Sequence, residues 1–180
     1  GDGLGNWNLV SGTPLTIDNF SSVGATWADV TNNGFPDCYT TNWYGQRNML
    51  YQNNGPGGFN QVVQIDPVLQ SSYSETASWG DFNQDGRLDL YVTNSAGDLK
   101  NLLFTRMSNG LYSQITSGPA ANDEFESRGV NWVDYDNDGD LDLFVCNESA
   151  QKNNLYRNDS NGIFTPILSG DLVNDQANSM

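Results

Sequence analysis

The sequence has 180 residues and a formal net charge of −15, from 22 acidic and 7 basic residues. Such a chain repels phosphate backbones and anionic membrane surfaces, so we expect neither of them as a partner. The sequence has no run of 18 apolar residues, so we expect no insertion into a membrane. Histidine is absent, which removes the commonest general base and the commonest transition-metal ligand. The two cysteines, Cys38 and Cys146, are too few for a disulfide scaffold or a zinc site.

Three acidic segments recur in one register along the chain. Their tryptophans, Trp27, Trp79 and Trp132, lie 52 and 53 residues apart. The segments are WADVTNNGFPDCYTTN (27–42), WGDFNQDGRLDLYVTN (79–94) and WVDYDNDGDLDLFVCN (132–147). Each is followed by a Leu-Tyr or Leu-Phe pair, an Asn-Gly turn, and an aromatic residue with an aliphatic residue three positions later. A period of this length predicts a repeat architecture.

Each repeat contains the pattern of four short strands. The first ends at the tryptophan, the second alternates after the acidic segment, and an Asn-Gly turn joins the third to the fourth. Four strands in about 50 residues, repeated in tandem, predict an all-β fold built of β-propeller blades with four antiparallel strands each. The predicted units are an outer strand of a preceding blade (1–12), three blades (13–65, 66–118 and 119–170) and the start of a linker (171–180).

The three predicted blades are too few to form a closed propeller, which typically has about 4 to 8 blades. Three complete units and one orphan strand leave unpaired strand edges, and such edges can pair with another chain. Either the chain belongs to a longer repeat protein, or copies complete each other's blades.

The acidic segments have the ligand pattern of a hard cation. Numbered from their first aspartate, they place oxygen side chains at positions 1, 3, 5 and 9 and a glycine at position 6. Position 7 is expected to contribute its backbone carbonyl, which allows Phe35, Arg87 or Asp140 to occupy it. The remaining candidates are Asp29, Thr31, Asn33 and Asp37; Asp81, Asn83, Asp85 and Asp89; and Asp134, Asp136, Asp138 and Asp142.

The expected ion is Ca²⁺, up to one in each loop. Position 12 lacks the glutamate of an EF-hand and the flanking segments are strands, so the pattern predicts a β-hairpin calcium loop. Magnesium is less suited, because it retains several waters. Positions 1, 3, 5 and 9 hold four carboxylates in the third loop, three in the second and two in the first. We therefore expect affinity to fall in that order.

These residues resemble the FG-GAP/VCBS repeats. The likeness lies in the DxDxDGxxD loop and the following NNLYRNDSNGIF, and it covers essentially the whole chain. Such repeats include the propeller blades of integrin α-subunits and of many bacterial secreted or surface proteins. The resemblance implies Ca²⁺ in the first hairpin of each blade. Thr31 departs from the pattern, and the Phe-Gly…Gly-Ala-Pro signature is not evident, so the bacterial-type variant is closer.

Aromatic residues outside the loops divide into two groups. The recurring Trp27, Trp79 and Trp132 are expected to pack between blades. Trp43 and Tyr44 occupy a loop where the other units carry Ser-Ala and Glu-Ser. They could stack on a sugar or anchor a protein partner, or pack on a neighbouring blade.

No nucleophile with a partnering base stands out, so the sequence favours a non-catalytic protein. The predicted function is adhesion or recognition of a glycan or protein by a secreted or cell-surface module. One alternative is a structural subunit that assembles with copies of itself, as filament or oligomer, through its unpaired strands. Another, less favoured, is an accessory propeller of a polysaccharide-degrading enzyme.

Overall fold

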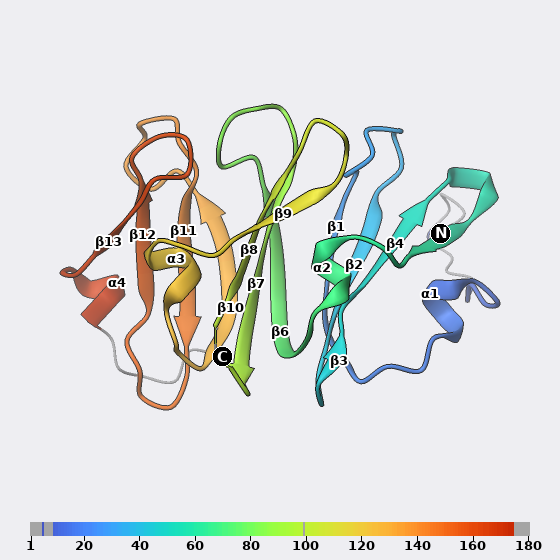
Figure 1. Cartoon of the computed structure of the whole chain (residues 1–180), viewed down its shortest axis with the longest axis horizontal. Coiled ribbons are helices and arrows are strands. Elements are labelled where there is room, and N and C mark those ends of the chain that lie inside the picture. Colours follow the sequence, from blue (N-terminus) through green and yellow to red (C-terminus); the bar gives the residue numbers. More distant parts are fainter. Residues whose placement is uncertain (1–4, 6–8, 99, 175–180) are drawn as a thin grey trace.

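The computed structural model describes residue 5, residues 9–98 and residues 100–174. Three antiparallel sheets stand side by side (Figure 1). The first contains β1 (Ser22–Ala28), β2 (Asp37–Asn42), β4 (Met49–Asn53) and β5 (Phe59–Val62) in this order. The second contains β6 (Ser71–Gly80), β7 (Asp89–Ala96), β8 (Leu102–Arg106) and β9 (Tyr112–Ile115), and the third contains β10 (Ser127–Val133), β11 (Asp142–Asn147), β12 (Asn154–Asn158) and β13 (Phe164–Ile167). The predicted all-β fold with four-stranded antiparallel blades is confirmed.

Short elements connect the blades. Four-residue helices precede successive sheets or follow the last one: α1 (Pro14–Ile17), α2 (Asp66–Leu69), α3 (Pro119–Asn122) and α4 (Asp171–Asn174). The two-residue strand β3 (Gln46–Arg47) leaves the first blade and pairs with β6 of the second. A 3₁₀ turn, Gly55–Gly57, lies between β4 and β5. The sequence did not predict these helices, because four residues are too few to show a helical periodicity.

The orphan strand expected at 1–12 falls mostly outside the described residues. Leu9 and Val10, which are described, are exposed and belong to no strand. Within the described part of the chain, no helix is long and apolar enough to cross a membrane.

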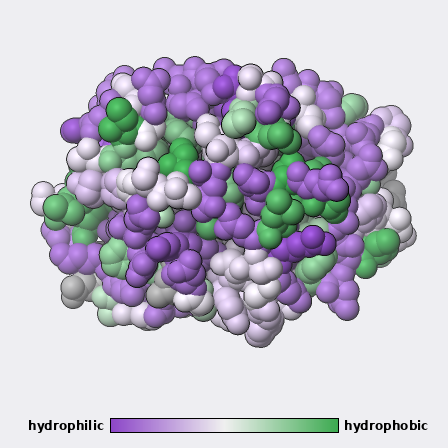
Figure 2. All heavy atoms as spheres, viewed as in Figure 1, coloured by the Kyte–Doolittle hydropathy of each residue, from purple (hydrophilic) through white to green (hydrophobic). Residues whose placement is uncertain are grey.

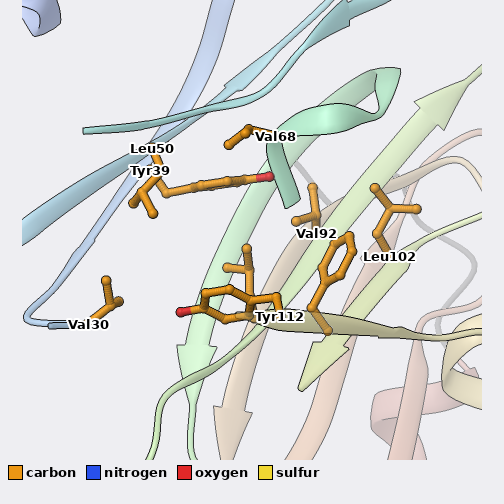
Figure 3. Packing of buried hydrophobic residues seen from close by; sticks show 9 residues of the cluster. Val30, Tyr39, Leu50, Val68, Val92, Leu102 and Tyr112 are labelled. Atoms are coloured by element: carbon orange, nitrogen blue, oxygen red, sulfur yellow. The ribbon is translucent and has the colours of Figure 1, made fainter. Parts of the chain in front are cut away.

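The middle blade is buried on both faces, because another blade packs against each face. Successive side chains of its strands point to opposite faces and so enter two different cores. In β7, Leu90 and Val92 pack in a core shared with the first blade, which also contains Tyr39 and Val68 (Figure 3). Tyr91, between them in sequence, belongs to the core shared with the third blade. All three β7 side chains are fully buried. The outer surface is mainly hydrophilic, with apolar residues in separate groups on the face shown in Figure 2.

The recurring tryptophans occupy equivalent places, but only two of them are covered by a neighbouring blade. Trp79 meets Tyr39 of the first blade edge-on, with ring centroids 5.9 Å apart. Trp132 stacks on Phe82 of the second blade at 5.6 Å and donates from its Nε1 to the carbonyl of Ser78. Trp27 contacts the ring of Phe59 in its own blade and is 52% exposed. The packing role expected of these residues is therefore visible for Trp79 and Trp132.

A row of serine and asparagine side chains crosses all three blades, and all of its members except Ser22 are buried. In the second blade Ser74 donates from Oγ to Oδ1 of Asn94, and the backbone N–H of Asn94 donates to Oδ1 of Asn101. Asn101 then donates from Nδ2 to Oγ of Ser127, the first serine of the third blade. The same bonds recur from Ser22 through Asn42 and Asn48 to Ser74, and from Ser127 through Asn147 to Asn153. We call this set the Ser–Asn row.

Hydroxyl groups add a second set of links between blades. Tyr39 donates to the carbonyl of Pro67 in α2, and Tyr91 donates to the equivalent carbonyl of Ala120 in α3. Thr41 and Thr93 donate to the carbonyls of Glu75 and Arg128, which occupy equivalent bulges of β6 and β10. The short helices are thus fixed to the blades that precede them.

We predict that Trp132→Ala lowers the free energy of unfolding by about 3 to 5 kcal/mol, because it leaves a cavity between two blades. The matched change Trp27→Ala should cost about 1 kcal/mol or less, since this ring is half exposed. Denaturant unfolding in dilute solution measures both. Equal losses for the two variants would contradict packing between blades as the role of Trp132.

Candidate metal centre

The three acidic loops have the same backbone conformation. They join the first and second strands of each blade, and lie along the upper edge of the molecule in Figure 1. Position 6 is a glycine with φ of 88° at Gly34, 81° at Gly86 and 93° at Gly139. Position 4 is also left-handed, with φ of 57°, 56° and 60° at Asn32, Gln84 and Asn137. Non-glycine residues adopt this region rarely, and asparagine does so more readily than most. Sequence reasoning did not single out position 4.

The first aspartate of each loop closes the turn in the same way. Asp134 accepts from the backbone N–H of Asp138 through Oδ1 and from that of Gly139 through Oδ2, both at 3.1 Å. Asp29 and Asp81 make the equivalent pair of bonds at distances between 2.6 and 3.0 Å. The side chain at position 5 then accepts from the backbone N–H at position 7. These bonds gather the oxygens of positions 1 and 5 on the inner side of the turn.

The third loop brings three carboxylates together. One carboxylate oxygen from each of Asp134, Asp136 and Asp138 lies within 4.8 Å of the others. Three like charges this close are unfavourable without a counterion, whereas a hard cation accepts six to eight oxygen ligands. Among the described residues, no ion pair involves any of these three aspartates.

The second loop has the same backbone framework, but Asn83 and Arg87 stand at positions 3 and 7, where the third loop has aspartates. Asn83 accepts from the backbone N–H of Asp85 and donates from Nδ2 to Oγ1 of Thr105. The guanidinium of Arg87 forms an ion pair with Asp85 and donates from Nε to the carbonyl of Arg106. Asp85 therefore already has one positively charged partner within the chain.

The first loop offers fewer charges. Asn33 donates from Nδ2 to the carbonyl of Asn53, and Thr31 Oγ1 lies 3.5 Å from Oδ2 of Asp37. Thr31 and Asn33 therefore stand at ligand positions with neutral side chains, as the sequence indicates.

Position 9 anchors each loop inside its blade. Asp37, Asp89 and Asp142 begin the second strands and are at most 1% exposed. Each accepts through Oδ1 from the backbone N–H at the end of the third strand, at 2.7 to 2.8 Å. In the first and third loops, Oδ2 accepts a further backbone N–H, from Val30 and Tyr135 respectively.

Asp89 differs, because its Oδ2 is buried without any hydrogen-bond partner. Burial raises the pKa of this carboxyl to about 6, although hydrogen bonds from Arg106 and Thr105 oppose the shift. A buried carboxylate oxygen with no donor is costly. A cation beside it would remove that cost, so the residues present fit the ion that the loop pattern predicts.

The side chains at position 7 make different contacts: Arg87 pairs with Asp85 of its own loop, whereas Phe35 and Asp140 contact other turns. Phe35 lies against Gly55, where an added Cβ would come within 2.5 Å of its ring. The Asp140 carboxylate accepts from Gln84 through Oδ1 and from Ser160 through Oδ2. With Arg87 these residues tie each loop to a neighbouring turn, which leaves only their backbone carbonyls as candidate ligands.

Trp43 and Tyr44 lie at the opposite ends of the strands from the acidic loops. Trp43 donates from Nε1 to the buried carboxylate of Glu75, and the Arg128 guanidinium lies 5.8 Å from its ring centroid. Glu75 also pairs with Arg128, which pairs in turn with Glu148. Tyr44 is 70% exposed with φ of 58°. The structure thus uses Trp43 in packing and leaves Tyr44 at the surface; sequence reasoning missed the Glu75–Arg128 pair, because 53 residues separate them.

Replacing Asp89 with asparagine tests the unpartnered oxygen. In the metal-free chain, Asp89→Asn should leave the free energy of unfolding unchanged or raise it at pH 7, because a buried charge is removed. The raised pKa means that the aspartate itself becomes less destabilising as pH falls from about 7 toward 4. The gain from the substitution should therefore shrink over that range.

The measurement is thermal or denaturant unfolding in EDTA, repeated with calcium chloride. With Ca²⁺ the order should reverse, and Asp89→Asn should be the less stable protein. Asp98→Asn, an exposed aspartate outside the loops, is the charge-matched control. A calcium-induced stabilisation equal in both variants would contradict a ligand role for Asp89.

Comparison with known families agrees with this repeat geometry. The family of FG-GAP-like repeats matches residues 29–92 and 134–179, and both stretches begin at the first aspartate of an acidic loop. No curated protein matches the chain. Domains of this family are generally non-catalytic and are typical of extracellular or surface proteins. The matched stretches cover more than half of the sequence, and the chain belongs to the FG-GAP-like repeat family.

Proposed function

We propose that this chain is a calcium-binding, non-catalytic module of a secreted or cell-surface protein. Ca²⁺ in the acidic loops makes each blade rigid, and the blade loops recognise a glycan or a protein. The observation that carries the calcium proposal is the buried Oδ2 of Asp89, which has no hydrogen-bond partner although Asp89 stands where the second acidic loop enters its strand. Two further observations support it: positions 4 and 6 have the same left-handed backbone conformation in all three loops, and three carboxylates lie close together in the third loop.

Calcium would act on architecture because of where its ligands begin and end. Positions 1 to 5 belong to the turn, whereas position 9 is the first residue of the second strand and also holds the end of the third strand. An ion held by both parts links the turn to two strands of its blade. The bacterial-type variant of the family, with calcium as the repeat's structural ion, fits this arrangement.

Calorimetric titration of the EDTA-treated chain with Ca²⁺ is the direct test. We expect up to three sites, with affinity highest in the third loop and lowest in the first, because ligand charge falls from four carboxylates to three and two. Mg²⁺ should bind more weakly. Asp136→Asn should remove the tightest site, and Asp98→Asn should remove none.

Absence of calcium binding at millimolar concentration would refute the proposed ion. A tightest site that survives Asp136→Asn would refute the predicted order. Three occupied sites would change the formal net charge from −15 to −9, since each ion carries two positive charges.

Recognition of a glycan or protein is supported by the exposed ring of Tyr44. Its neighbour Trp43 lies 5.8 Å away between ring centroids and is fixed by Glu75, so the aromatic pair has a rigid base. Rigid aromatic side chains supply contact area at a low entropy cost. The loop is therefore the part of the surface that we assign to a ligand.

A glycan array and a pull-down with the calcium-loaded chain test this assignment. Tyr44→Ala should weaken any ligand found by roughly tenfold or more, the typical cost of a central aromatic contact. Leu168→Ala is the control, because this side chain is 82% exposed on another part of the chain. Ligand binding that is unchanged in Tyr44→Ala would move the ligand site elsewhere.

A further inference from the structure

The side chain of Gln84 joins the second acidic loop to the third. Its Nε2 donates to the backbone carbonyl of Gly139 at 2.9 Å and to Oδ1 of Asp140 at 2.6 Å. Gln84 lies between Asn83 and Asp85, two candidate ligands of the second loop. Gly139 and Asp140 follow Asp138 in the third. One side chain therefore connects the backbones of two candidate ion sites in different blades.

The acceptor side of this contact is held firmly. Oδ2 of Asp140 accepts from Oγ of Ser160 at 2.9 Å, and the backbone N–H of Asp140 donates to Oδ1 of Asp138. Asp140 cannot follow a movement of Gln84 without losing one of these bonds. A displacement at Gln84 therefore reaches Asp138, which is a candidate ligand.

The first loop has no equivalent connection. Asn32 occupies the same left-handed position 4, yet within the described part of the chain its side chain makes no hydrogen bond to the second loop. Asparagine is one methylene shorter than glutamine, and position 7 of the second loop is Arg87 where the third loop has the acceptor Asp140. The two junctions therefore differ on both sides.

We infer that the second and third loops bind Ca²⁺ as a coupled pair, with Gln84 as the positioning residue between them. This inference rests on the proposed calcium function. An ion in the third loop, held by the Asp138 side chain and the Asp140 carbonyl, would fix the backbone on both sides of Asp140. It would thereby fix the Gly139 carbonyl and the Asp140 carboxylate, which accept from the amide of Gln84. Part of the conformational entropy that Asn83 and Asp85 lose on binding an ion is then already lost before the second ion binds. The first ion therefore raises the affinity of the second loop for Ca²⁺, which is positive cooperativity.

Charge does not oppose this coupling. Two nearby divalent ions repel each other, but the third loop contains five aspartates and stays negative when one ion is bound. The second loop contains three aspartates and Arg87, so a bound ion brings it close to neutrality. The negative charge that remains in the third loop favours, rather than hinders, an ion in the second.

A double-mutant cycle separates coupling from a local effect. The four proteins are the unchanged chain, Gln84→Asn, Asp136→Asn and the double variant, each titrated with Ca²⁺ by calorimetry. Asparagine stands at position 4 of both other loops, so Gln84→Asn keeps the left-handed backbone and loses only reach. We expect it to weaken the second-loop site about fivefold or more when Asp136 is present. In the Asp136→Asn background the same change should have an effect of less than about twofold.

The control is Asp98→Asn, which alters an exposed side chain outside the loops and should leave the second and third sites unchanged. Equal effects of Gln84→Asn in the two backgrounds would overturn the coupling while leaving calcium binding intact. Loss of calcium binding in all four proteins, including the unchanged chain, would instead refute the proposed function on which the coupling rests.

Discussion

The junction between neighbouring blades is the contact on which the rest of this structure depends. Each sheet has only four short strands, and a sheet of that size must bury at least one face to be stable. The middle blade buries both, with Leu90 and Val92 on one side and Tyr91 on the other. Packing one blade on the next also buries backbone and amide groups, which need partners. The Ser–Asn row supplies them. In the second blade Asn94 accepts from the serine of its own blade, and Asn101, which accepts from the backbone of Asn94, donates to the serine of the next blade.

This junction determines where the acidic loops lie. The first strands pack on one another through the tryptophans at their ends, and each loop begins two residues after the tryptophan. Because successive blades are equivalent, the loops fall on one edge of the molecule (Figure 1). Neighbouring loops then come close enough for Gln84 to reach Gly139. The proposed coupling between ion sites thus depends on the same geometry that packs Trp132 against the second blade.

The sequence predicts the parts of this arrangement that repeat and misses those that do not. The period of the tryptophans and the alternation in 88–92 and 141–145 were enough to predict four-stranded blades, because both are local patterns. Candidate ligands in each loop could be named by position, and the structure gathers Asp134, Asp136 and Asp138 as that numbering implies. The unpartnered oxygen of Asp89 could not be foreseen, since Asp37 and Asp142 occupy the same position and are fully bonded. The Gln84 bridge and the Glu75–Arg128 pair join residues more than 50 positions apart, and no local signal marks such contacts.

The three loops share one backbone but balance their charge in different ways. The first replaces ligand carboxylates by Thr31 and Asn33, so it has little charge to compensate. The second pairs Asp85 with the guanidinium of Arg87, a cation that the chain itself supplies. The third has five aspartates, and within the described chain none of them is paired with a basic side chain. Carboxylates at such distances repel one another, and a cation between them relieves that repulsion. The third loop therefore has the greatest need of an external ion, and the coupling that we propose would carry its state through Gln84 to a second loop that needs one less.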